Sequence, residues 1–287
     1  MRKYKAFEID YNIVEDAHTG SVPLPLLIGN GQSDLVCLSP LHGRSFLARS
    51  TNNGSVILKG CGLSYSGYRF LNTSEMGNGT MGLLLEKDAV RDFRLGNEIS
   101  ALGIKTNKME YVLKLNYPIY IKATDEIVFP HILQYSVITP WRIEDAPFME
   151  KSTIHQIISQ WSNATSPYHI CAADTLFCNL RTMHDNGILH NAITTHNYTW
   201  GLELLDFELS HSPSMPYERE EDVKLISLLR HREVIHTYQI VNYIAGVLHE
   251  EVKWDDLEDI LLKYGFDLNQ YNVKYCSTGL ELLDIKK

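Results

Sequence analysis

The stretch L-H-N-A-I-T-T-H-N-Y-T-W-G-L-E-L-L-D-F-E, from Leu189 to Glu208, decides how the chain is interpreted. A polar cluster, His190 to Asn197, is followed by an apolar run, Trp200 to Leu205, that predicts a short strand. Asp206 comes directly after this run. An Asn amide oxygen and an Asp carboxylate are ligands that suit Mg²⁺ bound to nucleotide phosphates. The stretch therefore predicts a metal site formed by Asn197 and Asp206.

The composition of the whole chain limits the classes of protein to which it can belong. The chain has 287 residues, 44% of them hydrophobic and 21% charged, which is typical of a folded protein of one large domain or two lobes. The net charge of -9 argues against nucleic acid as a partner, which normally requires a basic surface. It leaves room for a local basic pocket that binds a small anion such as ATP.

Cysteine and hydropathy patterns predict the cellular environment. Five cysteines form no C-x-x-C pair, so we expect reduced and mostly buried thiols. The twelve histidines show no zinc-binding spacing and are interpreted as scattered surface or core residues. The start of the chain has no apolar signal segment, and no run approaches 18 apolar residues. We therefore expect a cytoplasmic protein that is neither secreted nor membrane-bound.

The amino-terminal half contains a lysine in a notable position. Two or three strands are predicted between Gln32 and Lys59, at Asp34–Leu38, Ser45–Arg49 and Ser55–Leu58, and Lys59 follows the last of them. In protein kinases a lysine at this place reaches nucleotide phosphates and pairs with an acid of the next helix. The simpler interpretation is a surface lysine that ends a strand. The next helix is predicted at 88–102, and its acidic residues are Asp88, Asp92 and Glu98.

The remaining elements complete an α+β pattern. Further strands are predicted at Met109–Leu115, Ile119–Ala123 and His131–Ile138, and helices at Lys151–Trp161, Ile170–Met183, Glu218–His249 and Trp254–Tyr264. This order predicts a two-lobed protein-kinase-like fold. Residues 1–138 would form a β-rich lobe with one helix, and residues 139–287 would form a helical lobe that carries the catalytic loop and the metal-binding Asp.

Several short blocks resemble the selenoprotein O family, whose members are pseudokinase-like proteins that transfer AMP to protein hydroxyls. The matching blocks occur in the family's order: Gln32 with Gly43-Arg44, Leu58–Gly62, Met76–Gly79, Val90–Phe93 with Ala101–Thr106, and Trp141-Arg142. The spacings from His190 to Asn197 and from Asn197 to Asp206 also match. The resemblance covers Gly29 to Glu208, and the order of the blocks is more specific than any one of them.

The resemblance implies a flipped ATP, with its α-phosphate exposed so that AMP is transferred. Three basic residues would hold the displaced phosphates: Arg44, Lys59 and Arg142. Two turns would approach the nucleotide through backbone at Gly43, Asn78 and Gly79. Asp92 would pair with Lys59, and Asn197 and Asp206 would hold Mg²⁺.

Four departures from the family pattern leave the reaction open. His196 stands where the family has its proposed catalytic Asp, and a neutral imidazole can still accept a hydroxyl proton. Tyr135 replaces a second phosphate-binding arginine. Leu41-His42 replaces a Gly-Asp pair, and Asn78 replaces an Asp.

Three interpretations follow from these departures. The first is transfer of AMP to a protein hydroxyl. The second is a kinase that transfers the γ-phosphoryl group to a protein, peptide or small molecule. The third is a nucleotide-binding pseudokinase scaffold, and the presence of both metal ligands argues against it.

Overall fold

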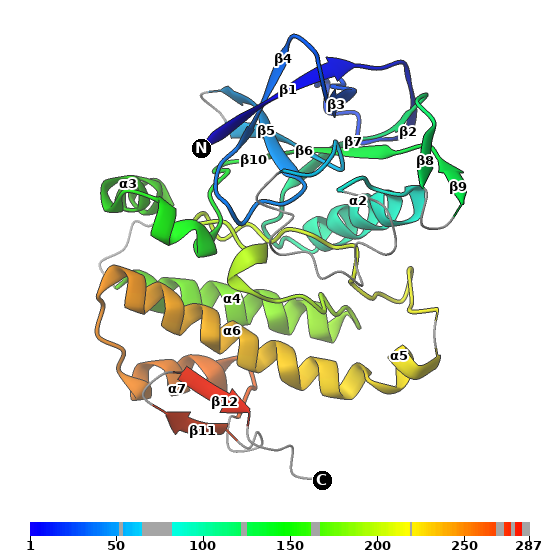
Figure 1. Cartoon of the computed structure of the whole chain (residues 1–287). Coiled ribbons are helices and arrows are strands. Elements are labelled where there is room, and N and C mark those ends of the chain that lie inside the picture. The colour runs from blue at the N-terminus through cyan, green and yellow to red at the C-terminus, as the bar shows by residue number, and fades with distance from the viewer. Residues whose placement is uncertain are drawn as a thin grey trace. The chain divides into compact units, whose positions relative to one another are not determined.

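The computed structural model of the chain describes residues 1–51, 54–64, 82–121, 125–161, 167–218, 220–267, 273–276 and 279–282. The chain divides into two compact units. One consists of Met1–Ala101 with Thr106–Trp141, and the other of Leu102–Lys105 with Arg142–Lys287. The first unit is built mainly from strands and the second mainly from helices (Figure 1). The combination of a strand-rich unit and a helical unit is the α+β class that the sequence predicts.

The first unit is organised around one sheet of eight strands in the order β2-β7-β10-β6-β5-β4-β1-β3. The strands are β1 (Arg2–Glu8), β2 (Tyr11–Asp16), β3 (Leu26–Ile28), β4 (Ser33–Cys37), β5 (Ser45–Thr51), β6 (Gly54–Lys59), β7 (Lys108–Leu115) and β10 (His131–Val137). Helix α2 (Glu86–Ala101) lies between β6 and β7 in sequence and packs on β7 and β10. A separate hairpin pairs β8 (Ile119–Ile121) with β9 (Glu126–Val128).

The sheet curls on itself, because two residues join strands that are far apart in its order. Strands β1 and β2 are six positions apart in the sheet, which would separate them by roughly 29 Å if it were flat. The connection from Glu8 to Tyr11 spans at most about 11 Å. Hydrogen bonds hold this connection: Asn116 N donates to Asp10 O at 2.7 Å, and Ile9 N donates to Pro25 O at 3.0 Å. The amino-terminal strands therefore close the curled sheet.

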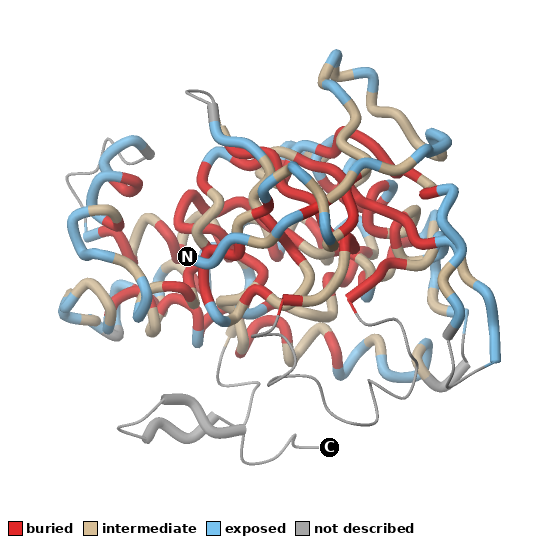
Figure 2. Tube along the Cα trace, turned by 45° about the horizontal axis from the view of Figure 1, so that its top comes forward, coloured by how far each residue is buried: buried red, intermediate tan, exposed pale blue. Residues whose placement is uncertain are grey.

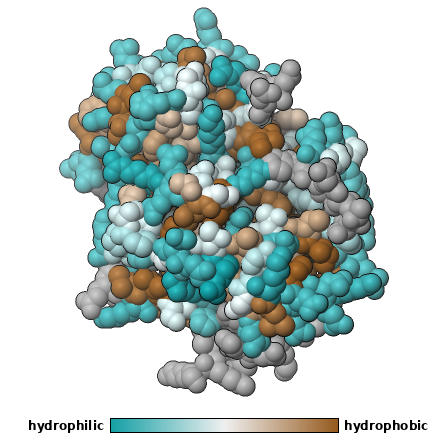
Figure 3. All heavy atoms as spheres, turned by 180° about the vertical axis from the view of Figure 1, so that it is seen from behind, coloured by the Kyte–Doolittle hydropathy of each residue, from teal (hydrophilic) through white to brown (hydrophobic). Residues whose placement is uncertain are grey.

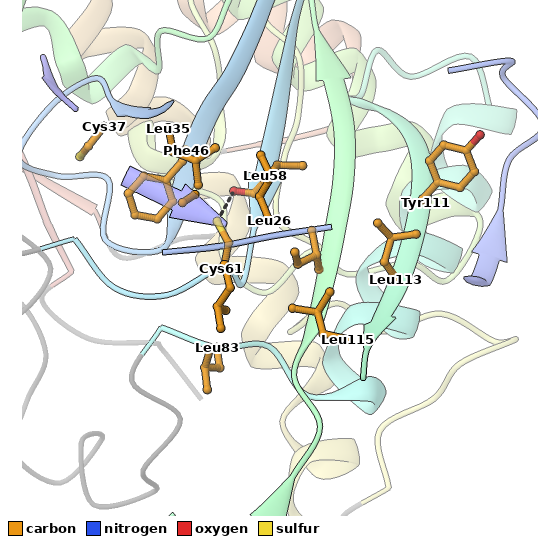
Figure 4. Close-up of a cluster of buried hydrophobic side chains, with 13 residues drawn as sticks. Leu26, Leu35, Cys37, Phe46, Leu58, Cys61, Leu83, Tyr111, Leu113 and Leu115 are labelled. Atoms are coloured by element: carbon orange, nitrogen blue, oxygen red, sulfur yellow. Dashed lines mark hydrogen bonds between the residues drawn. The ribbon is translucent and has the colours of Figure 1, made fainter. Parts of the chain in front are cut away.

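The core of the first unit lies inside this curl. Figure 4 shows its buried side chains, which come from seven strands and from the residues around Cys61 and Leu83. The Cys61 thiol donates to the Leu58 carbonyl within this cluster. Gln134 points to the same interior and binds the backbone of the segment before β3: its Nε2 donates to Val22 O at 2.9 Å, and its Oε1 accepts from Leu24 N at 2.8 Å. Residues of the amino-terminal segment thus form part of this interior.

The three strands predicted around Lys59 are confirmed as β4, β5 and β6. Strands β1 to β3 were not predicted, since residues 1–30 alternate only weakly between apolar and polar. Their stability comes from pairing with distant strands: Ala6, for example, pairs with both Ser33 and Ile28. Such pairing leaves little local pattern in the sequence.

The second unit is built around two long helices, α4 (Tyr168–Asp185) and α6 (Ile226–Leu248), which lie side by side (Figure 1). The shorter elements are α3 (Lys151–Trp161), α5 (Glu220–Lys224), α7 (Trp254–Lys263), the 3₁₀ turns η2 (Ile143–Phe148) and η3 (Thr195–Asn197), and the strands β11 (Val273–Cys276) and β12 (Gly279–Leu282). The sequence predicts a single helix at Glu218–His249, but the structure has two. Helix α5 ends at Lys224, and α6 begins after Leu225. His249 in the left-handed conformation ends α6.

The prediction of a strand at Trp200–Leu205 was wrong. Trp200 and Gly201 form a turn, Leu202 and Glu203 belong to no strand, and Leu204 makes only an isolated bridge with Tyr198. The cause is Thr199, whose hydroxyl accepts from Gly201 N and from Glu203 N, both at 3.2 Å. A side chain that bonds nearby backbone in this way competes with strand pairing.

Burial follows this organisation. Buried residues, drawn red in Figure 2, gather in the interior, and exposed residues lie at the periphery. Among the described cysteines, Cys37 and Cys61 are buried, Cys171 is half-buried and Cys178 is exposed, and all four are free thiols. The face in Figure 3 carries hydrophobic atoms in separate patches among hydrophilic ones. In the part of the chain that the structure describes, no helix has the length and apolar character to cross a membrane.

Candidate functional site

The first unit contains a buried ion pair between two predicted site residues. Lys59 ends β6 and is 3% exposed, and Asp92 lies on α2 and is 0% exposed. The Lys59 Nζ lies 2.6 Å from Asp92 Oδ2. A short Asp side chain requires a close approach of helix and sheet. The small residues Ala89 and Gly96 on the buried side of α2 allow this approach. The structure therefore places Lys59 in the interior and excludes a surface strand end.

One of the two predicted backbone turns lies in the same unit. Gly43 and Arg44 are half-buried in the β4–β5 turn, residues 38–44, immediately before β5. The residues of the second turn, Asn78 and Gly79, lie outside the described residues, and their role stays a prediction.

In the second unit, His190 fixes the loop that precedes Asp206. His190 is fully buried, and its Nε2 contacts Leu205 O at 2.9 Å. Its ring packs edge-on against Phe207, with ring centroids 5.3 Å apart. Ser210 Oγ donates to His190 O at 3.1 Å. One histidine thus holds the residues on both sides of Asp206.

Asn197 presents an unused oxygen in this loop. Its Nδ2 donates to Ala192 O at 2.9 Å, which fixes the orientation of the amide. Asn197 Oδ1 is buried and has no hydrogen-bond partner among the described residues. A buried acceptor without a partner costs about 1–3 kcal/mol. A cation would satisfy this oxygen, so the amide fits the predicted Mg²⁺ ligand.

Asp206 adopts a backbone conformation that few residues accept. Its φ is 67°, in the left-handed region, where Asp is one of the better tolerated residues. Its neighbours Leu205 and Phe207 are buried, while Asp206 is half-buried. Leu205 N donates to Asn197 O at 2.9 Å, which ties the two predicted ligands to one backbone unit. Within the described ranges, no cluster of three His, Cys, Asp or Glu residues forms a metal site. In a Mg²⁺ site held by Asn197 and Asp206, water and phosphate oxygens would supply the other ligands.

His196 forms part of a polar group with Arg142 and Glu144. Its Nδ1 is hydrogen-bonded to Glu144 Oε1, and Arg142 Nη1 donates to His196 O at 3.0 Å. Burial lowers the pKa of His196 below its ordinary value of 6.5, and the Arg142 charge lowers it further. The carboxylates of Glu144 and Asp206 act in the opposite direction but do not outweigh this. The imidazole is therefore neutral near pH 7, with its Nε2 left to accept a proton.

Helix α6 carries a residue that the sequence interpretation missed. Glu233 is buried, and its Oε2 contacts His184 Nε2 at 2.8 Å. Its Oε1 accepts from the backbone of Asn191, whose φ is 63°. Arg232 Nη2 donates to Asn191 O at 3.0 Å. These contacts fasten the start of the loop that contains His190 and Asn197 to α6. The available signal was an acidic residue inside the apolar stripe of a helix.

Glu144 was also missed, and the sequence offered no signal for it. Its partner His196 is 52 positions away, and Glu144 belongs to no recognisable motif. Only the packing of η2 against η3 brings the two side chains together.

Comparison with known proteins finds similarity among solved structures only. No family model matches the chain, and no curated protein matches it. Among solved structures, the chain is similar to the Toxoplasma gondii specific rhoptry antigen kinase domain, with 9% identity and a TM-score of 0.34. This match covers 80% of the present chain and 76% of the other.

Proposed function

We propose that the protein is an ATP- and Mg²⁺-dependent transferase, and that it transfers AMP to a protein hydroxyl as selenoprotein O does. The observation that carries this proposal is the buried Oδ1 of Asn197, which has no partner in the described part of the chain and lies on the same backbone unit as Asp206. If Asn197 had only a structural role in the core, its amide oxygen would be expected to accept a hydrogen bond within the protein. When bound, Mg²⁺ would neutralise phosphate charge.

Arg142 supports a phosphate ligand near this loop. Its side chain is 5% exposed, yet its guanidinium donates only to the neutral carbonyl of His196 in the described chain. A buried cation without a carboxylate partner is strongly unfavourable, and a phosphate would relieve that cost through charge-assisted hydrogen bonds. This environment agrees with the phosphate-binding role that the resemblance implies for Arg142.

His196 would act on the acceptor. Glu144 orients the ring through Nδ1, and the neutral Nε2 can accept a proton from an attacking hydroxyl. Asp92 would hold the ammonium group of Lys59 in a fixed position for contact with a phosphate, as the corresponding pair does in kinases. Catalysis would then rest on positioning and electrostatics.

Transfer of the γ-phosphoryl group is the second candidate, and Tyr135 favours it. Tyr135 stands where the family has a phosphate-binding arginine, and it is buried in β10 opposite Ile57. A buried tyrosine in the sheet supplies no positive charge for a flipped nucleotide. This loss weakens the case for AMP transfer without affecting the metal ligands.

Labelled ATP tests the proposal directly. The protein is incubated with Mg²⁺, candidate acceptors and either α- or γ-labelled ATP. Incorporation of the α-label supports AMP transfer, and incorporation of the γ-label alone supports a kinase. Asp206→Ala should reduce incorporation by at least about 100-fold, because the phosphates lose their metal. The matched control is Asp185→Ala, which removes an exposed carboxylate of α4 in the same unit.

Two results would count against the assignment. Full activity of Asp206→Ala would exclude the metal pair. Binding of ATP by the wild type without transfer of either label would instead support the scaffold interpretation.

A further inference from the structure

The β4–β5 turn is held in one conformation by the side chains of two residues that lie outside it, Cys37 and Ser64. The thiol of Cys37 donates to Ser39 O at 3.1 Å and to His42 O at 3.2 Å. Ser64, which follows β6, is fully buried, and its Oγ donates to the same His42 carbonyl at 2.9 Å. The Ser64 N also donates to Gly43 O at 2.8 Å. Two consecutive carbonyls, those of His42 and Gly43, therefore point toward Ser64.

This arrangement fixes the direction of an amide. The peptide bonds are trans, so each N–H points opposite to the carbonyl of the preceding residue. Because the His42 carbonyl points to Ser64, the Gly43 N–H points away from it. The Gly43 N–H has no hydrogen-bond partner in the described part of the chain, and Gly43 is half-buried. The absence of a Cβ at Gly43 allows a ligand to approach this N–H closely.

We infer that Ser64 and Cys37 are positioning residues that preset the Gly43 N–H for a nucleotide phosphate. This inference rests on the proposed function, which supplies the phosphate. A turn held by buried donors loses little conformational freedom on binding, so less affinity is lost to ordering than with a mobile glycine loop. Ser64 and Cys37 themselves touch no ligand. They act by holding the His42 carbonyl, which sets the peptide that carries the amide.

The test compares two probes, ATP and adenosine, by calorimetric titration of the whole protein. Ser64→Ala removes the Oγ donor and keeps the Ser64 N–H, so the 42–43 peptide gains freedom. We expect ATP to bind about 3- to 10-fold more weakly, the effect of about one hydrogen bond. Adenosine has no phosphate, and its affinity should not change. Equal ATP affinity in wild type and Ser64→Ala, or an equal loss for both probes, would overturn the inference.

Matched variants separate positioning from general damage. Ser55→Ala removes a buried hydroxyl from the other end of β6, and it should leave the affinities for both probes unchanged. If Ser64→Ala does not fold, Cys37→Ala serves in its place, since it removes the other donor to His42 O. Cys37→Ser retains a donor and should restore ATP binding. Failure of the wild type to bind ATP would refute the proposed function. Normal wild-type binding with no selective loss in the variants would refute only the positioning role.

Discussion

The charges of Lys59 and Asp92 are almost fully removed from water, and their side chains are 4% and 1% exposed. Breaking such a pair by removal of one partner leaves a buried charge and costs about 3–5 kcal/mol. We therefore expect Asp92→Asn to lower the free energy of unfolding by about that amount, measured by urea denaturation. The double variant Lys59→Met/Asp92→Leu should lose much less, because neither charge remains.

The exposed pair of Lys5 and Asp34 provides the comparison, with side chains 60% and 45% exposed. Asp34→Asn should leave the urea midpoint close to that of the wild type, because water and salt screen a surface pair. Wild-type stability in Asp92→Asn would contradict the account of the buried pair.

Single residues differ in how far the sequence predicts them. Lys59 and Asp92 occupy recognisable positions, the end of a strand and the buried side of the next helix. The spacing from Asn197 to Asp206 predicts a metal site, and in the structure Leu205 N donates to Asn197 O beside Asp206. Glu144 and Glu233 have partners 52 and 42 positions away. No local pattern marks Glu144, and the apolar stripe of α6 marks Glu233 only as an acidic residue on a buried helix face. Long-range contacts of this kind depend on the packed fold, so the sequence predicts only part of the site.

At the scale of elements, the start of helix α4 depends on a distant carboxylate. Pro167 precedes the helix and provides no side-chain cap. Glu250, just beyond α6, accepts from Tyr168 N at 2.8 Å and from His169 N at 2.9 Å, and its Oε2 also contacts His169 Nδ1 at 2.7 Å. Burial raises the pKa of Glu250, but the hydrogen bonds from His169 and Tyr168 outweigh burial and lower it below the ordinary value of 4.5.

The direction of this pKa change predicts how stability depends on pH. A carboxylate with a lowered pKa in the folded state stabilises the protein fully above the unfolded-state value near 4.5. That stabilisation is lost as the pH falls through the folded-state pKa. Glu250→Gln should therefore be about 1–2 kcal/mol less stable than wild type at pH 7, and the difference should vanish in strong acid.

Thermal and urea unfolding between pH 7 and pH 3 would measure this difference. Glu251→Gln alters an exposed neighbour and serves as the control, with no expected change in stability. A difference for Glu250→Gln that stays constant across this pH range would contradict the capping role.

Elements with a strong local pattern are the ones that the sequence predicts well. Helix α3 has the bounds expected from its apolar spacing, and α7 ends one residue earlier than expected. The segment Trp200–Leu205 has equally apolar residues but forms no strand, because the Thr199 hydroxyl binds the backbone. Local polar contacts and distant pairing therefore account for the errors.

At the scale of the whole molecule, each unit has a hydrophobic core of its own. In the first unit the amino-terminal strand β1 completes that core through the fully buried Ala6. In the second unit the core includes Leu176 and Val241 from the adjacent helices α4 and α6. Parts of a chain that have separate cores open as separate cooperative units.

Two glycine variants test whether the units unfold separately. At Gly31 a Cβ would lie 1.9 Å from Ala6 O, so Gly31→Ala must displace β1 and should cost at least about 2 kcal/mol. At Gly246, in α6, a Cβ meets nothing within 4 Å, so Gly246→Ala should stabilise the helix by about 0.5–1 kcal/mol. Hydrogen exchange measured by peptide should show faster exchange in β6 and β10 for Gly31→Ala, with α4 and α6 unchanged. Gly246→Ala should slow exchange in α4 and α6 only. A change that spreads over both units in either variant would show that the two cores open in one transition.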